Sequence, residues 1–330
     1  MASDDNYAKH LGVALTSIAE NSSENKKYDV IIFANDLSLH NRDLLTKTVA
    51  QHKNFSIRFL NTGDYISNVS LTEKCHINKS TYLRFAILDL LRNFDRIVYL
   101  DCDLVANHDI AELFDLDLGE NYVAAARDST MASWNNLKNQ FGKDRCSYNR
   151  NIVGLENVFD YFCAGIMIFN VQVMRQHIST DKLFEIAASR TWAFQDQDVL
   201  NRVCRGKVTF LPIKWNYMPF NDVENAQHIA FSAPAYIFQE YLAAKSDPYI
   251  IHYAGHYQPM YVKNVHCSEV YWQYAKKSLY YEEILCEMIP PAAQLPLRLR
   301  TKIKRRLARL LPADTFPGRA ARKLYHSIRK

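Results

Sequence analysis

Short runs of β-branched and aromatic residues alternate with helical patterns along the first two-thirds of the chain. Such runs predict buried strands, and apolar residues that recur every three or four positions predict amphipathic helices. Alternation of this kind predicts βαβ units, and therefore an α/β fold with a mostly parallel sheet. The predicted strands cover residues 28–33, 55–60, 96–100, 122–126 and 165–170, and predicted helices at 41–52 and 81–91 separate the first three.

The helical pattern at residues 8–20 stands almost at the start of the chain, with no strand before it. An α/β sheet usually opens with a strand. We therefore expect a first strand to be missing ahead of Met1, as a late start codon would cause.

Glycine-rich phosphate loops are absent from the sequence. Nine glycines occur in 330 residues, and neither G-x-G-x-x-G nor G-x-x-x-x-G-K-[ST] is formed by them. Both loops bind phosphates through backbone N–H groups at a helix N-terminus. If this sheet binds a nucleotide, another group must neutralise the phosphates, and a bound metal ion is the obvious candidate.

Asp101 and Asp103 follow the predicted strand 96–100 directly and are separated by Cys102. In extended backbone, residues i and i+2 point to the same side, so both carboxylates can face one point at the carboxyl end of a strand. Open α/β sheets bind ligands there, and carboxylate oxygens suit a hard cation such as Mn²⁺ or Mg²⁺. A solvated strand end or a helix cap is equally compatible with this motif taken alone.

Five motifs occur in a fixed order along the chain: Asp4–Tyr7, Asn93–Val105, Tyr161–Gly165, Gln195–Asp198 and His252–Gly255. Together they resemble glycosyltransferase family 8, and they are most similar to the bacterial lipopolysaccharide α-galactosyl- and α-glucosyltransferases. The resemblance runs from about Ala2 to about Pro259. It implies a GT-A fold, which is a Rossmann-like mixed sheet flanked by helices. It also implies hexose transfer from UDP-hexose, with a divalent metal and with retention of anomeric configuration.

The resemblance assigns a metal site to Asp101, Asp103 and His252, which would hold Mn²⁺ or Mg²⁺ against the UDP diphosphate. A metal there neutralises the leaving UDP, where charge develops as the sugar–phosphate bond breaks. A single histidine is more often a packed or exposed residue. The position of His252 beside Tyr253 and Gly255 in a matching motif favours the role of ligand.

Contacts with uridine are implied for Ala2, Asp4 and Asn6. Asp4 would accept from the uracil edge, and Asn6 would reach the ribose or the phosphate. Asp4 or Asp5 can also cap the helix that follows, and both roles are compatible. Arg84 matches a family arginine that contacts the donor sugar and diphosphate, and the alternative is a surface arginine.

Asp196 and Gln197 match the family pair that lies closest to the transferred sugar. The acceptor hydroxyl would attack from the face that UDP leaves, while Gln197 stabilises positive charge on the anomeric carbon and Asp196 orients a sugar hydroxyl. A retaining hydrolase instead needs two carboxyls about 5 Å apart, and Asp196 and Asp198 are not an obvious pair of this kind. Further donor contacts are implied at the matching positions Cys102, Cys163, Ala164, Gly255 and Gln258.

Two of the site residues depart from the family pattern. The family motif G-x-x-K-P-W has a lysine on the diphosphate, and here Gln258 replaces it. A neutral hydrogen bond then replaces a charge-assisted one, which weakens the expected UDP affinity; His256 or Lys263 could supply the lost cation. Cys163 replaces a family asparagine that contacts a sugar hydroxyl, which bears on the identity of the donor.

The net charge of +5 is the sum of two opposite parts. Residues 298–330 contain twelve Lys and Arg against one acid, a balance of +11, so the rest carries 28 basic and 34 acidic residues, a balance of −6. Apolar residues recur at helical spacing in this basic tail, a pattern typical of a segment that binds an anionic membrane surface. The alternative is a solvated helix docked on the body. Nucleic acid is disfavoured, because the body is acidic and has no recognised binding motif.

Seven scattered cysteines without a CxxC pair fit a reducing compartment, and the sequence shows no pattern of a signal peptide or of a membrane span. We expect a cytoplasmic protein, peripheral on the inner face of the cytoplasmic membrane.

The expected domains are a GT-A catalytic domain at 1–265, a helical extension at 266–297 and a basic membrane-association tail at 298–330.

The sequence thus predicts a retaining hexosyltransferase that moves galactose or glucose from UDP-hexose to a sugar hydroxyl. The acceptor would be a lipopolysaccharide or lipooligosaccharide core or a similar glycan. Two alternatives stay open. The departures at Gln258 and Cys163 fit a catalytically weak UDP-sugar-binding protein or a UDP-sugar hydrolase. The carboxylates alone fit a metal-dependent phosphodiesterase without a preference for UDP.

Overall fold

The structure is a computed structural model that describes residues 1–34, 36–62, 79–219, 232–255, 258–262 and 264–288. One unit extends from Met1 to Tyr281, and a second begins at Glu282. The basic tail at 298–330 lies outside the described residues, and so do His256 and Lys263. The domain boundaries expected at residues 265 and 297 stay predictions.

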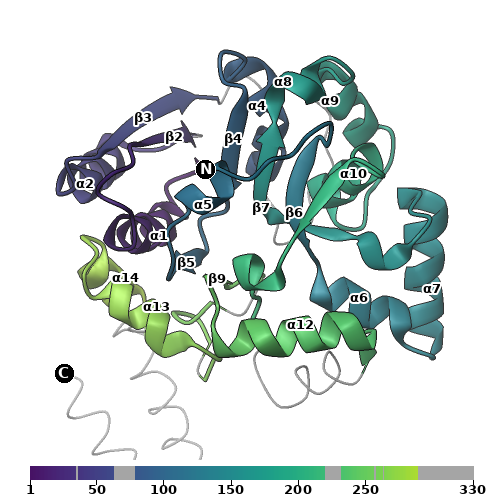
Figure 1. The fold of residues 1–330 in the computed structure, drawn as a ribbon. Helices are drawn as coiled ribbons and strands as arrows, with labels where there is room; N and C mark the ends of the chain where they lie inside the picture. Colours follow the sequence, from purple (N-terminus) through teal and green to yellow (C-terminus); the bar gives the residue numbers. More distant parts are fainter. Residues whose placement is uncertain (35, 63–78, 220–231, 256–257, 263, 289–330) are drawn as a thin grey trace, which may run out of the picture. The chain divides into compact units, whose positions relative to one another are not determined.

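The strands of the described residues form three sheets. The first contains β1 (Ala2–Ser3), β2 (Tyr28–Ala34) and β3 (Phe55–Asn61), all parallel and in that order. The second has the order β4 (Arg96–Leu100), β7 (Phe162–Asn170), β6 (Val123–Arg127) and β8 (Val208–Leu211), and the third pairs β5 (Leu104–Ala106) with β9 (Ile250–His252). Figure 1 shows β3, β2, β4, β7 and β6 following one another across the molecule. All five predicted strands are confirmed, with small shifts at their ends.

The mixed α/β fold is confirmed, but the expectation of a mostly parallel sheet is wrong at its centre. β7 runs antiparallel to both of its neighbours, β4 and β6, and β5 runs antiparallel to β9. An apolar run indicates that a strand is buried, but it carries no information about the direction of the strand. Between β6 and β7 the chain passes through α6 (Ser129–Asn136) and α7 (Gln140–Tyr148) and then returns in the opposite direction.

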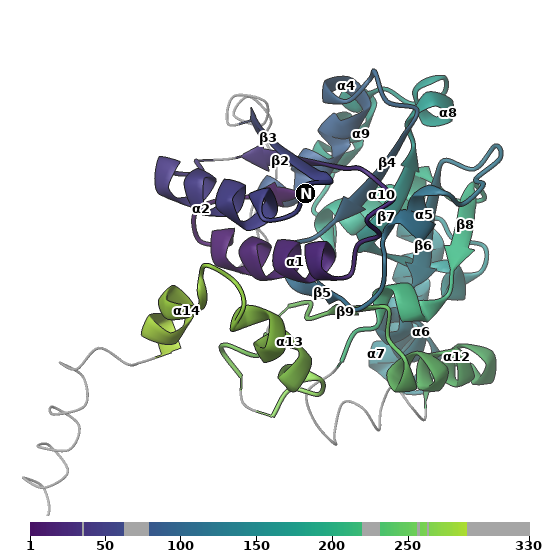
Figure 2. The ribbon, with the colours of Figure 1, turned by 60° about the vertical axis from the view of Figure 1, so that its left-hand side comes forward.

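The two helices at the start of the chain form as predicted, and the third does not. The predicted helices at 8–20 and 41–52 are α1 (Ala8–Glu20) and α2 (Leu39–Ala50), which lie side by side next to the first sheet (Figure 2). The single helix predicted at 81–91 is instead a 3₁₀ segment, η1 (Lys79–Ala86), followed by one turn, α4 (Ile87–Leu90). The other helical elements are α5 (Ala111–Phe114), η2 (Asn149–Val153), η3 (Val158–Asp160), α8 (Val171–Arg175), α9 (Thr180–Ala188), α10 (Gln195–Val203), η4 (Ile213–Asn216), α12 (Ala235–Ser246), α13 (Ser268–Ala275) and α14 (Tyr281–Met288).

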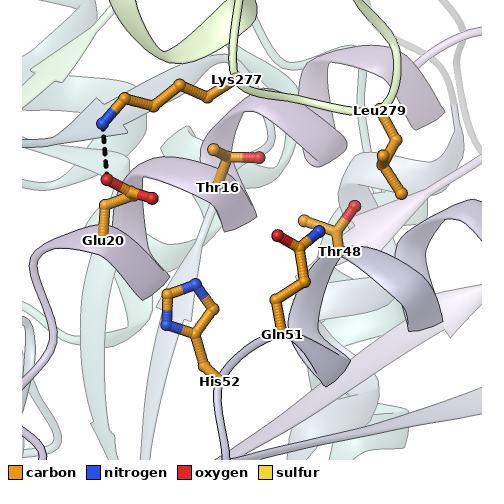
Figure 3. Close-up of a pocket in the computed structure, with 7 residues that line it drawn as sticks. All are labelled: Thr16, Glu20, Thr48, Gln51, His52, Lys277 and Leu279. Carbon is orange, nitrogen blue, oxygen red and sulfur yellow. Dashed lines mark hydrogen bonds and ion pairs between the residues drawn. The ribbon is translucent and has the colours of Figure 1, made fainter.

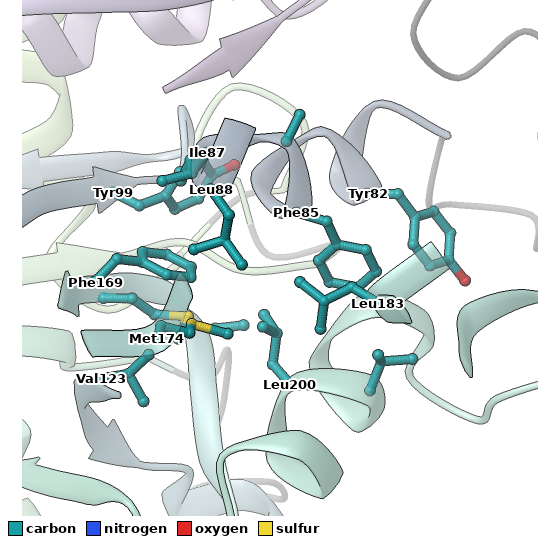
Figure 4. Packing of buried hydrophobic residues seen from close by; sticks show 14 of the residues in the cluster. Tyr82, Phe85, Ile87, Leu88, Tyr99, Val123, Phe169, Met174, Leu183 and Leu200 are labelled. Atoms are coloured by element: carbon teal, nitrogen blue, oxygen red, sulfur yellow. The ribbon is translucent and has the colours of Figure 1, made fainter. Parts of the chain in front are cut away.

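Two apolar clusters cover the two faces of the second sheet. Tyr99 and Phe169 point into one cluster, together with other strand residues such as Val123 and with side chains from η1, α4, α8, α9 and α10 (Figure 4). Leu100 and Ile168, their neighbours in the strands, point into the other cluster, together with residues of α1 and β5. This alternation is the pleat of a sheet that is buried on both faces. None of the helices in the described ranges is both long enough and apolar enough to cross a lipid bilayer.

The first residues of the chain form a short strand, although the sequence pattern predicts none ahead of residue 8. The Phe33 N–H donates to the Met1 carbonyl at 2.9 Å, and the Met1 amino group donates to the Ile31 carbonyl at 3.1 Å. Residues 2–3 thus lie in the sheet beside β2. The expectation of a missing strand ahead of Met1 stays a prediction.

The segment that follows α13 packs against α1 and α2. The Tyr280 ring is fully buried against Gly12, and its hydroxyl donates to the Asn41 carbonyl at 3.1 Å. Lys277 pairs with Glu20 at 2.6 Å beside a polar pocket of about 20 Å³ (Figure 3). This volume holds one water molecule, so the pocket is not a site for a sugar or a nucleotide.

We predict that Gly12→Ala destabilises the protein. In an unobstructed helix interior this change stabilises by about 1 kcal/mol. Here the added Cβ would lie 2.2 Å from the Tyr280 ring, and overpacking costs about 1–3 kcal/mol. Denaturant unfolding measures the difference. In a Tyr280→Leu background the same change should cost less or become stabilising, and an equal loss in both backgrounds would contradict the contact.

Candidate active site

Two carboxylates and one imidazole come together where β4 ends. The Asp101 N–H donates to the Gly165 carbonyl at 2.8 Å, which extends the β4–β7 ladder by one residue. β5 then pairs with β9, and the Tyr253 N–H donates to the Asp103 carbonyl at 2.8 Å. His252 Nε2 consequently lies 3.2 Å from an oxygen of Asp103 and 3.9 Å from an oxygen of Asp101. We call Asp101, Asp103 and His252 the metal-site cluster.

A glycine in β7 makes room for the metal-site cluster. A Cβ at Gly165 would lie 2.2 Å from His252 Cε1 and 2.9 Å from Asp101 Oδ2, which is far inside van der Waals contact. The pairing of β7 with β6 also shifts register in this region, as at a β-bulge. Next to the glycine, both backbone groups of Ala164 bond to side chains of the site, namely those of Arg84 and Gln197.

The metal-site cluster suits a hard divalent cation. One ligand atom from each of Asp101, Asp103 and His252 lies within 4.8 Å of the others. Carboxylates and imidazole are ligands that Mn²⁺ accepts, and Mg²⁺ binds through the carboxylate oxygens. Burial disfavours charge on His252, yet its hydrogen bond with Asp103 raises its pKa well above the usual value. The two carboxylates that stabilise an imidazolium here would stabilise a bound metal cation in the same way.

Arg84 is only 4% exposed, so it is not a surface arginine. Its Nη2 donates to Asp101 at 2.9 Å, its Nε lies 3.0 Å from Asp196 Oδ2, and its Nη1 donates to the Ala164 carbonyl. The guanidinium also lies over the Tyr99 ring, 4.5 Å from the ring centroid. One buried cation thus links the metal-site cluster with the carboxylate that is expected to orient the sugar.

Gln197 lies in the first turn of α10, and its amide is held at both ends. Oε1 accepts from the Ala164 N–H at 2.9 Å. Nε2 lies 3.2 Å from Asp128 Oδ2 and 3.3 Å from the Tyr161 hydroxyl. These contacts orient the side chain, so a sugar would meet an amide whose position is already set.

Asp198, two residues beyond Asp196, has a structural role. It is fully buried, and its two oxygens accept from the Tyr161 hydroxyl at 2.6 Å and from the Tyr148 hydroxyl at 2.8 Å. Because both oxygens are occupied, Asp198 is not available as the second carboxyl of a retaining hydrolase.

The sequence interpretation missed two residues of the site, Asp128 and Asn216. Asp128 follows β6 directly, caps α6 with one oxygen and faces Gln197 with the other. Its place at the carboxyl end of a predicted strand is the same signal that identified Asp101. Asn216 Oδ1 lies 3.0 Å from His252 Nδ1. No local pattern marks Asn216, because its role depends on the pairing of its segment with β9.

The residues expected to bind uridine lie in and after β1. The Ala2 carbonyl accepts from the Cys102 thiol at 3.1 Å, which joins this segment to the end of β4. Asp4 accepts from the Tyr7 N–H at 3.0 Å, but the N-cap residue of α1 is Tyr7 itself. The alternative that Asp4 or Asp5 caps this helix is therefore wrong. Asn6 is exposed to solvent. Contacts of these residues with uridine stay predictions.

Both departures from the family pattern lie against the metal-site cluster. Gln258 is buried, and its Nε2 donates to Asp103 Oδ2 at 3.4 Å. Cys163 is also buried, with its Sγ 4.0 Å from His252 Nδ1. Gly255, expected to contact the donor, has a φ of +74°, a conformation that glycine adopts at little cost.

The family profile of Glycosyl transferase family 8 matches residues 1–259, which include every residue of this site. The chain belongs to glycosyltransferase family 8. The family 8 chain is 27% identical, over 66% of its length, to a glycosyltransferase-like protein of Haemophilus influenzae. It is 24% identical, over 82% of its length, to the lipopolysaccharide 1,2-glucosyltransferase of Escherichia coli K12. It spans 62% of the first relative and 75% of the second.

Solved structures of two glycosyltransferases have a fold similar to that of this chain. The bifunctional glycosyltransferase WbbM aligns with a TM-score of 0.77 and 30% identity, over 86% of this chain and 50% of its own. The galactosyltransferase LgtC, solved with donor and acceptor sugar analogs, aligns with a TM-score of 0.68 and 22% identity, over 84% of this chain and 95% of its own. The GT-A fold is confirmed.

We predict that the Asp196 carboxyl of this family 8 chain titrates near pH 6. Burial raises its pKa to about 6 against the opposing charge of Arg84, and the negative charge of Asp101 adds to the rise. Asp196 is therefore mostly ionised at pH 7, and it loses its ion pair with Arg84 as the pH falls through 6. A carboxyl ¹³C NMR titration measures the midpoint. Arg84→Met removes the opposing cation and should raise the midpoint, whereas an unchanged midpoint would contradict the ion pair.

Proposed function

We propose that this chain is a retaining hexosyltransferase that moves galactose or glucose from UDP-hexose to a sugar hydroxyl of a lipopolysaccharide or lipooligosaccharide core, or of a similar glycan. The observation that carries the proposal is the arrangement of the metal-site cluster, Arg84 and Gln197 around the backbone of residues 164–165. The choice of sugars and acceptor is supported by similarity to an enzyme named for lipopolysaccharide 1,2-glucosyl transfer and by the fold shared with a galactosyltransferase.

Asp101, Asp103 and His252 would hold Mn²⁺ or Mg²⁺ against the UDP diphosphate. The bound cation supplies positive charge where negative charge develops on the departing UDP. Arg84 pairs with Asp101 and Asp196, so it holds these two carboxylates at a fixed separation. Its charge also adds to the positive potential that a diphosphate would meet there.

Gln197 and Asp196 would contact the transferred hexose. The acceptor hydroxyl forms the new bond to the anomeric carbon on the face where the bond to UDP breaks, and the leaving phosphate oxygen takes the hydroxyl proton. Gln197 stabilises positive charge on the anomeric carbon. Its amide is neutral and is bonded at both ends, so it is a poor covalent nucleophile. This supports transfer on one face without a glycosyl–enzyme intermediate.

A second candidate is a UDP-sugar hydrolase, or a UDP-sugar-binding protein with weak activity. It is favoured by Gln258, which stands against Asp103 at the position where the family has a cation. In a hydrolase, water would take the place of the acceptor hydroxyl. Transfer stays the first candidate, because the chain belongs to a family of transferases.

The test is UDP release with Mn²⁺ over a panel of UDP-sugars, with and without a truncated lipopolysaccharide acceptor. Release that requires both one UDP-hexose and the acceptor supports transfer, and NMR of the product reports whether the anomeric configuration is retained. Equal release without the acceptor would identify a hydrolase. Metal-dependent cleavage of phosphodiesters with no preference for UDP would identify a phosphodiesterase.

We predict that Asp103→Asn and Gln197→Ala separate metal binding from stabilisation of the sugar. Asp103→Asn removes a metal ligand, so hexosyl transfer should be lost while the fold remains. Gln197→Ala should lower kcat by about 10²-fold or more, with the affinity for the donor little changed. Steady-state kinetics with purified UDP-hexose measure both. Asp144→Asn and Gln172→Ala, at exposed positions, are the matched controls. Full activity of Asp103→Asn or an unchanged kcat for Gln197→Ala would contradict the assigned role.

We also propose that the basic tail at 298–330 holds the enzyme on the inner, cytoplasmic face of an anionic membrane, where a glycolipid acceptor would lie. The proposal rests on the sequence, in which seven of the twelve basic residues surround an apolar stripe. Each basic residue contributes about 1 kcal/mol near an anionic surface.

Truncation after Pro291 should therefore abolish sedimentation with anionic vesicles while transfer to a water-soluble acceptor is kept. The full chain is the control, and neutral vesicles test the contribution of charge. A truncated protein that still sediments with anionic vesicles would show that the tail is not the anchor.

A further inference from the structure

Asn216 is held beside His252 by the backbone. It is the last residue of η4, and the next residue, Tyr217, pairs with β9: the Tyr217 N–H donates to the Ile250 carbonyl at 3.0 Å, and the His252 N–H donates to the Tyr217 carbonyl at 2.8 Å. The Asn216 side chain is 1% exposed and that of His252 is similarly buried. Asn216 Oδ1 lies 3.0 Å from His252 Nδ1.

Two contacts restrict the His252 ring. Asn216 Oδ1 contacts Nδ1, and an Asp103 oxygen lies 3.2 Å from Nε2, while the missing side chain of Gly165 leaves room for Cε1. When Nδ1 donates its proton to the Asn216 oxygen, the lone pair of the neutral imidazole is on Nε2, the nitrogen that faces Asp101 and Asp103. That is the tautomer that can ligate a cation at the metal-site cluster. The opposite tautomer would direct a proton at the cation.

Packing alone does not explain why an asparagine occupies position 216. Its Nδ2 is buried and has no hydrogen-bond partner within the part of the chain that the structure describes. An unpaired buried N–H destabilises the folded state, and an apolar side chain of similar size would avoid that loss. The hydrogen bond to His252 is the contact that an apolar residue could not provide.

We propose that Asn216 is a positioning residue for the metal-site cluster, which sets the tautomer and orientation of His252 and thereby gives the site much of its affinity for a divalent cation. The inference deepens the proposed function and rests on its metal site. Cys163 is the competing partner of the same nitrogen, but its sulfur lies 4.0 Å from Nδ1, beyond the amide oxygen at 3.0 Å. Sulfur is also the weaker acceptor.

The experiment measures Mn²⁺ affinity of the full chain by electron paramagnetic resonance, together with the melting temperature of the metal-free protein. Asn216→Leu should weaken Mn²⁺ binding by about 10- to 100-fold, while the melting temperature is unchanged or higher. Asn216→Asp keeps an acceptor for Nδ1–H and should retain wild-type affinity or exceed it. The control is Asn121→Leu, which also removes a side-chain hydrogen bond of an asparagine, a partly buried one to Thr209 at 2.8 Å, but at the opposite end of β6 from Asp128. It should leave Mn²⁺ affinity unchanged.

Equal Mn²⁺ affinity of wild type and Asn216→Leu would overturn the inference and leave the metal site intact. A wild-type protein that binds no Mn²⁺ would overturn the proposed metal-dependent function, and the inference with it. If Asn216→Leu does not fold, long-range ¹⁵N NMR of wild type with Mg²⁺ decides the question. A protonated Nδ1 and an unprotonated Nε2 on His252 support the inference, and the opposite tautomer overturns it.

Discussion

The rest of the site depends on two carboxylates, Asp101 and Asp103, that lie largely inside the protein at the end of β4. Their negative charge must be balanced by partners within the fold. Burial raises the pKa of Asp101 although Arg84 opposes the rise, whereas at Asp103 the hydrogen bond from His252 outweighs burial and lowers the pKa. Each carboxylate therefore has its own buried partner, the Arg84 guanidinium for Asp101 and the His252 imidazole for Asp103. Removing one partner of a buried ion pair costs about 3–5 kcal/mol. Arg84 and His252 thus stabilise the folded state, and the same negative charge gives the position its attraction for a metal and a diphosphate.

Strand pairing brings residues from distant parts of the chain into contact with these carboxylates. The antiparallel strand β7 provides Gly165, whose missing side chain leaves room for His252, and the backbone of Ala164, which bonds to Arg84 and Gln197. The short pair β5–β9 sets His252 beside Asp103. One irregular stretch of β7 therefore contacts both the metal-site cluster and the residues expected to meet the sugar. This arrangement explains how binding of a nucleotide diphosphate and chemistry at the anomeric carbon can share one site.

Features that depend on local sequence could be predicted, and features that depend on strand neighbours could not. The strand that ends at Leu100 and the paired carboxylates after it follow from short-range patterns, and the order of the motifs identified His252. The direction of β7 could not be predicted, because an apolar run reads the same in both directions. Asn216 was missed because its partner His252 is far away in the sequence. Asp128 was overlooked although it follows a predicted strand, as Asp101 does. The burial of Arg84 follows from its two carboxylate partners, which a helical pattern does not reveal.

The central claim is that Asp101, Asp103 and His252 together hold one divalent cation against the diphosphate of the donor. Anomalous diffraction at the manganese absorption edge, from crystals grown with MnCl₂ and UDP, tests it most directly. The account predicts one anomalous peak within bonding distance of a carboxylate oxygen of Asp101, a carboxylate oxygen of Asp103 and Nε2 of His252, with the UDP phosphates on its open side. A peak at another place in the protein, or UDP bound here without any peak, would contradict it.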